Sequence, residues 1–462
     1  MYGGHISRRR LLARGLVGGA MFAAGTGALA SGRGAKAAPL AGYAGYPDYP
    51  LPNPALSGER ATLRVWLTPE LAGQPAYRAA IGLFERQYPH LTVEVSPVAR
   101  DDIPTRLKIA VAGGGGKGSS AVPDLVSHHA YVFGAQGLAQ ESDFLWAAWG
   151  QEGAFLPAAM QDVTWRINKF GIPLVSNAVV TILNADMFRR AHAPLPTGRT
   201  TFAQFTQAIA AVKRDVGTRY GMILSADPAT ATAVVHANGG ALLRTEAISG
   251  RNLQLLTDRR VVEALRFYTE LGWKERLAPL PPEGPSNRLY LAQLFATRQA
   301  PAFFGTLSDL TLIQSVDSGI RLAVAPLPGG TTGRTRGSVD DGVSLFVTDP
   351  SRHPHAAFEL AKWLVARPPA LAVARSLRLA PTVSAYYGDR LFHRDALSAT
   401  IFDAARVARP ILLDAYAEAV DLYRDALRAS FGGQDAGRRL AAIARPAQAA
   451  MDRADAGIDS DG

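Results

Sequence analysis

The chain has 462 residues, 48% of them hydrophobic and 19% charged, a globular composition that is long enough for two domains. Six of the ten net positive charges fall in residues 1–36, so the remainder carries only +4 and shows no basic patch that would indicate nucleic-acid binding. Cysteine is absent, which excludes iron–sulfur clusters, attached haem c, thiolate zinc, a catalytic thiol and a lipid-modified cysteine anchor.

The N-terminus has the order of an export leader. Ser7-Arg8-Arg9-Arg10-Leu11-Leu12 precedes an apolar stretch of small residues that runs to about Ala30. Paired arginines after a serine resemble the twin-arginine export consensus, so we predict a twin-arginine-type signal peptide over 1–38. The protein is then expected in the periplasm or at the extracytoplasmic cell surface. An ordinary secretory leader and an uncleaved leader that anchors the protein are the alternatives.

The folded part is predicted to begin after a tether. Residues 39–60 are rich in Pro, Gly and Tyr without periodicity, which is typical of a linker. Strand-like alternation and helical spacing then take turns. The predicted elements are a strand at Leu63–Leu67, a helix at 75–88, a strand at Leu91–Val95, a helix at 102–112 and a short strand at Asp124–Val126. This order predicts an α/β sheet covered by helices on both faces.

The same alternation continues to the C-terminus. Thr201 begins a helix with a capping-box pattern, and Asp258 begins another. The later predicted elements are short buried strands at Arg321–Pro326 and Val343–Val347, a helix at Pro354–Ala366 that Pro368-Pro369 stops, and a helical portion from Pro410 to about Ala450. Gly113–Ser120 superficially resembles a phosphate loop, but Val111 occupies the first glycine position and Gly118 follows Lys117 where that motif needs Ser or Thr, so we predict a flexible loop.

Several segments, in order, resemble the large solute-binding proteins of ABC importers, the relatives of maltose-binding protein. They are Leu63–Leu67, Phe84–Pro89 and Leu91–Val95; Pro123–Val126; Gly171–Pro173 with Thr181–Phe188; Thr201–Phe205; Ala302–Gly305 with Arg321–Pro328; and Ser338–Val347 with Ala356–Ala361. The chain departs from that family at four points, one of which is a Gly-rich insertion, Gly113–Ser120, that lengthens the loop before Pro123. Leu183 replaces a usual Tyr, Phe202 replaces a frequent Trp, and no Trp follows Phe304 where many sugar binders stack a pyranose ring.

The resemblance implies an α/β, two-lobe periplasmic-binding-protein fold (type II, maltose-binding-protein-like) with hinge crossings and a helical C-terminal portion. It assigns 61–177 plus 341–366 to the N-terminal lobe and 178–340 plus 367–455 to the C-terminal lobe. We expect crossings between the lobes near Asn177–Val180, Ser338–Gly342 and Val365–Arg367. The expected role is capture of a small solute, with a carbohydrate or polyol favoured, by hinge closure of a monomer that serves the transmembrane subunits of an ABC permease.

Two groups of candidate ligand-binding residues follow strands of the first lobe, where such folds carry their sites. Trp66, Thr68 and Glu70 lie at the end of the first strand, where an aromatic face, a hydroxyl and a carboxylate suit a sugar. His128, His129 and Tyr131 match the family's first-lobe binding loop. Packing of Trp66 between helix and sheet is the alternative, and a metal site at the two histidines lacks a third ligand at suitable spacing.

The other candidates lie at or beside the predicted crossings. Asn177 can both donate and accept hydrogen bonds, which suits a ligand as well as a hinge. Asp340 and Asp341 are not expected to form a catalytic pair, because the side chains of consecutive aspartates diverge. One of them is instead expected to accept a hydrogen bond from the ligand. Phe304 and Thr306 match the family's second-lobe aromatic position, and one of Phe303 and Phe304 is expected to face the cleft.

Neither a cofactor nor a catalytic residue is predicted. The chain contains no G-x-S-x-G, zinc or dinucleotide motif. The alternatives to a transport role are an exported enzyme, either a hydrolase or a cofactor-bearing oxidoreductase, and a binding protein that feeds a sensor.

Overall fold

The computed structural model describes residues 49–460 apart from Ser57, Glu59, 114–121, 247–249, 283–287, Thr332, Arg336 and Asp395. The predicted leader, the first part of the tether and most of the glycine-rich loop therefore lie outside the described residues. Within the described part, no helix is both long and apolar enough to cross a membrane.

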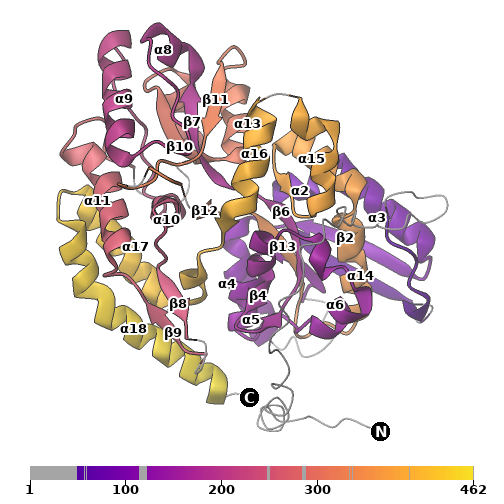
Figure 1. Ribbon diagram of the computed structural model, residues 1–462. Helices are drawn as coiled ribbons and strands as arrows, with labels where there is room; N and C mark the ends of the chain where they lie inside the picture. Colours follow the sequence, from indigo (N-terminus) through magenta and orange to yellow (C-terminus); the bar gives the residue numbers. More distant parts are fainter. Residues whose placement is uncertain are drawn as a thin grey trace, which may run out of the picture. The chain divides into compact units, whose positions relative to one another are not determined.

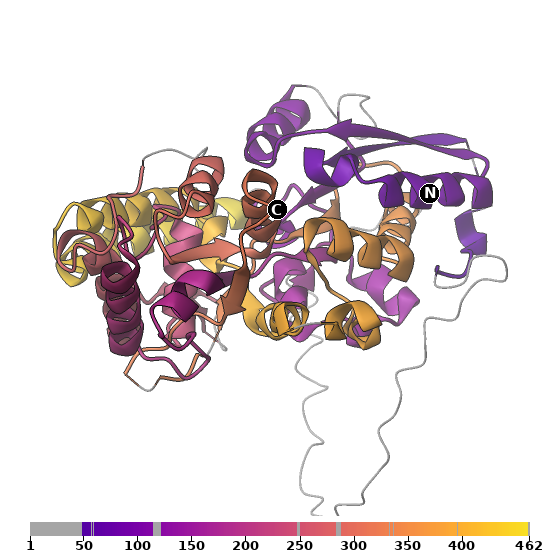
Figure 2. The same cartoon turned by 90° about the horizontal axis from the view of Figure 1, so that it is seen from above.

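The first lobe is built on a six-stranded mixed sheet (Figures 1 and 2). Its strands, in spatial order, are β14 (Ala380–Pro381), β6 (Ile172–Ser176), β13 (Val343–Val347), β3 (Leu125–His128), β1 (Ala61–Leu67) and β2 (Leu91–Pro97). β1 runs parallel to β2 and β3, whereas β13 runs antiparallel to β3 and β6. The predicted strands Leu63–Leu67 and Leu91–Val95 are therefore confirmed as neighbours.

Helices cover this sheet because their apolar faces match it. Leu63, Val65 and Leu67 of β1 are fully buried, as their alternation predicts. Tyr77 and Phe84 of α3 (Pro75–Gln87) are buried as well. α14 (Pro354–Leu364) and α15 (Arg367–Leu377) pack against α3.

Part of the predicted tether belongs to this lobe. Tyr49 is buried, and its ring centroid lies 5.2 Å from that of Trp363 on α14. The backbone N–H of Asn53 donates a hydrogen bond to the Tyr88 hydroxyl at 2.7 Å. Folded structure thus begins at least as early as Tyr49, in the second half of the 39–60 segment.

The second lobe has a three-stranded antiparallel sheet of β10 (Ala302–Thr306), β7 (Val179–Asn184) and β11 (Leu322–Ala325). Its helices include α9 (Phe202–Val216), α11 (Arg259–Trp273), α17 (Ala417–Phe431) and α18 (Ala436–Ser460). α17 and α18 pack on each other and on α11, as both views show. The predicted capping box is present, since Thr201 Oγ1 accepts from the Gln204 N–H at 3.1 Å.

Aromatic rings fill the space between this sheet and its helices. The Phe304 ring lies 5.3 Å from Phe205 and 5.9 Å from Tyr268, measured between centroids. Phe303 is buried in a separate apolar cluster with Phe295 and Leu307. Phe303 and Phe304 are both buried, in apolar clusters on opposite faces of β10, so the expectation that one of them faces a cleft is wrong.

The chain passes between the lobes at Asn177–Ala178, which join β6 to β7, and at 340–342, which join β12 (Ser338–Val339) to β13. These segments lie within two of the three ranges predicted as crossings. The third, at Val365–Arg367, is wrong because α14 and α15 on either side of it both pack against α3. The pairing of β14 with β6 likewise places 380–381 with the first sheet, although the predicted division gave 367–455 to the other lobe. β15 (Ala408–Arg409) later pairs with β12 beside the second crossing.

Replacing a buried aromatic ring tests the second-lobe core. Phe304→Ala is expected to lower the free energy of unfolding by about 3–5 kcal/mol, because it leaves a cavity among Phe205 and Tyr268. Chemical denaturation measures the change. Phe144→Ala, at a side chain that is 67% exposed, is the matched control and should cost well under half as much. Equal losses in the two variants would contradict the assignment of Phe304 to the core.

Candidate ligand-binding site

Charged side chains from both lobes converge on the second crossing. Arg100 belongs to η2 (Arg100–Asp102), which follows β2, and Arg288 is the first residue of α12 (Arg288–Ala296) in the second lobe. Arg100 Nη1 lies 3.0 Å from Asp341 Oδ1, and Arg288 Nη1 lies 3.7 Å from Asp341 Oδ2. The carboxylate of Asp341 therefore lies between one guanidinium of each lobe.

Both arginines have further partners. Arg100 also donates to the backbone carbonyl of Asp341 at 2.8 Å. Burial alone would lower the pKa of Arg100, but the nearby carboxylate of Asp341 raises it, so the group stays charged. Arg288 donates to Asp309 Oδ1 at 2.9 Å and to Thr306 Oγ1 at 2.5 Å.

A buried chain of hydrogen bonds lies behind Arg100. Arg100 Nη2 bonds to His129 Nε2, His129 Nδ1 lies 2.5 Å from Asp162 Oδ1, and Ser344 Oγ donates to Asp162 Oδ2 at 2.5 Å. A guanidinium can only donate, so Nε2 is the acceptor and Nδ1 carries the hydrogen that reaches Asp162. The Ser344 hydroxyl bonds to the carboxylate and not to the imidazole, so this order provides no activated nucleophile.

His128 has a different environment from its neighbour. Its ring is half-buried against Phe133, with ring centroids 5.1 Å apart. Burial and the positive charge of Arg100 lower the pKa of His128 well below its usual value. The imidazole is therefore neutral, and its Nδ1 accepts from the His129 backbone N–H at 2.8 Å.

Asn177 and Asp340 join the two crossings. Asp340 Oδ1 accepts from the backbone N–H of Asn177 at 2.8 Å and from that of Gly342 at 2.9 Å. The Asn177 side chain accepts from the Ser308 N–H at 3.0 Å and donates to the Ser308 hydroxyl at 3.1 Å, at the start of α13 (Leu307–Val316). Burial raises the pKa of Asp340 to about 6. These bonds tie the two crossings to each other and to the start of α13.

The structure brings six of the predicted residues together: His128, His129, Asn177, Thr306, Asp340 and Asp341. Tyr131 lies beside this group, with its ring centroid 5.7 Å from that of His129, but it is fully buried and its hydroxyl donates to the Ile411 carbonyl at 2.9 Å. Trp66 is half-buried against the core, and Glu70 is exposed. Thr68 is buried, and its hydroxyl has no hydrogen-bond partner among the described residues. Phe304 lies in the core, so its assignment as a ligand contact is corrected.

The sequence did not single out Arg100, Asp162, Arg288 or Asp414. Arg100 could have been found, because it follows a strand of the parallel part of the sheet. The other three reach the site only through long-range packing. Asp414 lies in η8 (Leu412–Ala415), where burial raises its pKa to about 7, opposed by the nearby His129.

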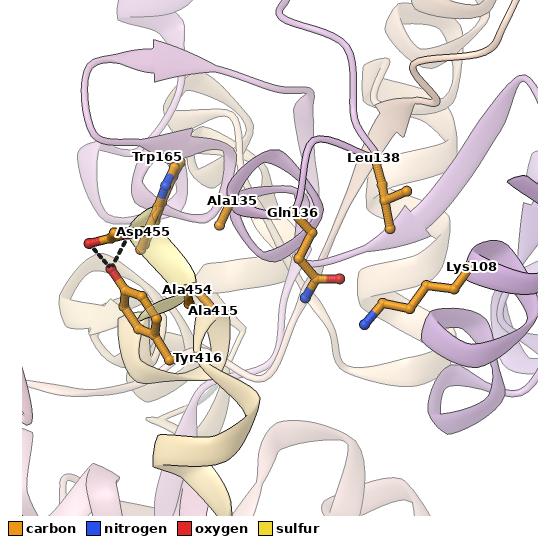
Figure 3. Close-up of a pocket in the computed structure, with 9 residues that line it drawn as sticks. All are labelled: Lys108, Ala135, Gln136, Leu138, Trp165, Ala415, Tyr416, Ala454 and Asp455. Atoms are coloured by element: carbon orange, nitrogen blue, oxygen red, sulfur yellow. Dashed lines mark hydrogen bonds between the residues drawn. The ribbon is translucent and has the colours of Figure 1, made fainter. Parts of the chain in front are cut away.

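A separate pocket of about 310 Å³ lies beside α5 (Ala130–Ala135). Figure 3 shows Trp165, Tyr416 and Asp455 on one side of it and Gln136 and Lys108 on the other. The Tyr416 hydroxyl donates to Asp455 at 3.0 Å, and Arg166 Nη2 lies 3.2 Å from the same carboxylate. In the described part of the chain, no group of three or more His, Asp or Glu residues could hold a metal ion.

Comparisons with known proteins agree with this architecture. The family model for bacterial extracellular solute-binding proteins matches residues 68–368. The sugar-binding protein MalE of Xanthomonas citri is 18% identical, with a TM-score of 0.72 over 87% of this chain and 100% of that one. UgpB of Mycobacterium tuberculosis in complex with glycerophosphocholine is 17% identical, with a TM-score of 0.70 over 86% and 99%. The GacH receptor of Streptomyces glaucescens, solved with acarbose, is 17% identical, with a TM-score of 0.69 over 85% and 98%. No curated protein matches the chain.

Asp414→Asn tests the buried carboxylate. An aspartate whose folded pKa is about 7 stabilises the fold at low pH, and this stabilisation is lost as pH rises towards 7 and above. The variant should therefore exceed the wild type in free energy of unfolding by about 4 kcal/mol at pH 8, and by much less at pH 4. Denaturant titrations at both pH values measure this. Asp421→Asn, on the exposed face of α17, is the control, and a pH-independent effect of Asp414→Asn would refute the prediction.

Gly342→Ala tests the packing of the second crossing. A Cβ at this position would lie 2.1 Å from the Val175 carbonyl oxygen and 2.8 Å from Asp340 Oδ1. Because backbone cannot move away as a side chain can, we expect a loss of about 3 kcal/mol in the free energy of unfolding. Gly153→Ala is the matched control, since nothing lies within 4 Å of its Cβ. Unchanged melting of Gly342→Ala would show that the crossing is looser than this geometry indicates.

Proposed function

Because the chain belongs to the family of bacterial extracellular solute-binding proteins, we propose that it captures a small solute outside the cytoplasm and passes it to the transmembrane subunits of an ABC permease. The observation that carries the proposal is the convergence of Arg100, Asp341 and Arg288 from two lobes onto one crossing. A solute bound there can contact both lobes at once. Its contacts would then favour the closed arrangement over any open one.

A carbohydrate is the favoured solute. Guanidinium and carboxylate groups can bind the hydroxyls of a sugar as donors and acceptors. Structures similar to this chain were solved with acarbose and with maltotetraose, which supports the same class. Of the aromatic residues predicted to contact the solute, Phe304 is buried and Trp66 is half-buried.

An organic phosphate ester is the second candidate solute. Two guanidinium groups at one crossing suit anionic oxygens as well as hydroxyls. The similar structure of UgpB in complex with glycerophosphocholine supports this reading. The role in capture is the same for either solute.

Further parts of the proposal rest on the sequence. We propose that the protein works as a monomer without catalysis, since the Ser344–Asp162–His129 order activates no hydroxyl. Export through a twin-arginine leader over 1–38 explains how a folded protein reaches the extracytoplasmic side. Anchoring by an uncleaved leader stays open as the alternative to release.

A thermal-shift screen tests capture directly. Maltotetraose, acarbose, D-tagatose and glycerophosphocholine are added separately to the protein. A solute at 100 times its Kd stabilises the native state by about 2.7 kcal/mol, which raises the melting temperature by a few degrees. Arg214→Ala, which removes an exposed pair with Asp215, is the control and should show the same shift.

Small-angle scattering supplies an independent readout of the same proposal. A bound solute that holds the lobes together should reduce the radius of gyration of the wild type. Well-folded protein that none of the four solutes stabilises would argue against capture of these classes. Stabilisation by glycerophosphocholine alone would select the phosphate ester over the carbohydrate.

A further inference from the structure

Arg100 has hydrogen-bond donors to spare at the meeting point of the two lobes. Nη1 donates to the carbonyl and the carboxylate of Asp341, and Nη2 donates to His129. A guanidinium carries five N–H groups, so the Nε–H and one Nη2–H have no partner among the described residues. The side chain is 25% exposed, so a solute could reach these donors.

The remaining donors have a defined geometry. The guanidinium is planar, and its edge presents two N–H groups that match a pair of neighbouring oxygen atoms. A vicinal diol of a sugar or polyol offers such a pair, and so do two oxygens of a phosphate group. A lysine in the same place would present a single point charge without this fork.

The hydrogen-bond chain behind Arg100 fixes where its donors point. His129 and Asp162 are each more than nine-tenths buried, and Ser344 is fully buried. They come from three separate elements: His129 precedes α5, Asp162 lies in η4 (Gln161–Val163), and Ser344 lies in β13. Packing therefore holds each bond of the chain in place, and the last bond ends on the guanidinium.

We propose that Arg100 binds a pair of neighbouring oxygen acceptors on the captured solute, and that His129, Asp162 and Ser344 are positioning residues that orient its guanidinium. This inference rests on the proposed capture of a solute. To that function it adds Arg100 as the group that selects the solute. It also gives a reason for the buried hydrogen-bond chain, which is to orient Arg100.

The arrangement makes binding sensitive to pH. His129 can accept from Arg100 only while its Nε2 is unprotonated. The groups that face it are Arg100 from η2, Asp162 from η4, Asp341 from the crossing, Asp414 from η8, and its own neighbours His128 and Tyr131. Burial lowers the pKa of His129 and Asp162 raises it, with a net rise, so the ring gains its second proton at a higher pH than an ordinary histidine does. The protonated ring would repel Arg100 and release its guanidinium.

The test compares four proteins with the four solutes of the screen at pH 8 and pH 5.5. Calorimetry of the best-binding solute should show at least about tenfold weaker binding for Arg100→Ala and for Arg100→Lys, since neither offers the fork. Wild-type affinity should fall severalfold at pH 5.5. His129→Gln should lose this pH dependence, because the amide accepts from Arg100 and donates to Asp162 without titrating.

A ligand-free measurement separates this inference from the proposed function. Nitrogen-15 NMR of the His129 ring at pH 8 should show the neutral form with its hydrogen on Nδ1. A hydrogen on Nε2, or an imidazolium at pH 8, would overturn the positioning role whether or not any solute binds. Solute binding that Arg100→Ala leaves unchanged would overturn the binding role of Arg100 while sparing capture. If no solute binds the wild type, the proposed function fails and the binding role of Arg100 fails with it.

Discussion

The carboxylate of Asp340 is the constraint on which the two-lobe arrangement depends. Its Oδ1 accepts backbone hydrogen bonds from Asn177 and Gly342, one on each crossing. The carboxylate thereby holds the start of β7, in the second sheet, close to the start of β13, in the first. The burial that raises the Asp340 pKa to about 6 is the energetic cost of placing a carboxylate there, and the two N–H donors offset part of it. Arg100, Asp341 and Arg288 meet only because these crossings hold their elements close together.

Much of the fold could be predicted because its signals are local. Alternation at Leu63, Val65 and Leu67 predicted β1, and the capping box at Thr201 predicted the start of α9. The prediction of a third crossing at Val365–Arg367 was wrong for a physical reason. Pro368-Pro369 ends one helix but also suits the first turn of the next, and no local signal tells that α15 packs on the same face as α14.

The candidate site was predicted only in part. His129 could be predicted from its position at the end of a strand, and Asp341 from the glycine that follows it and indicates a turn. The covalent chain itself places both residues at the edge of the sheet. Asp162 and Arg288 arrive from a short 3-10 turn and from a helix start far along the chain, so only the packed structure reveals them. The assignment of Phe304 to the ligand was wrong because α9 and α11 cover its face of β10, and the sequence of the strand does not reveal these helices.

The ion pair between Arg166 and Asp455 has a consequence for closure. α18 packs on α11 and α17 of the second lobe, while Arg166 lies in the turn between β4 (Thr164–Trp165) and β5 (Asn168–Lys169), beside α5. Any hinge motion that separates these elements must break a pair whose side chains are 33% and 14% exposed. Salt weakens partly exposed pairs of this kind. Under the proposed capture by hinge closure, the ionic strength of the medium would thus enter the balance between open and closed forms, independently of the solute.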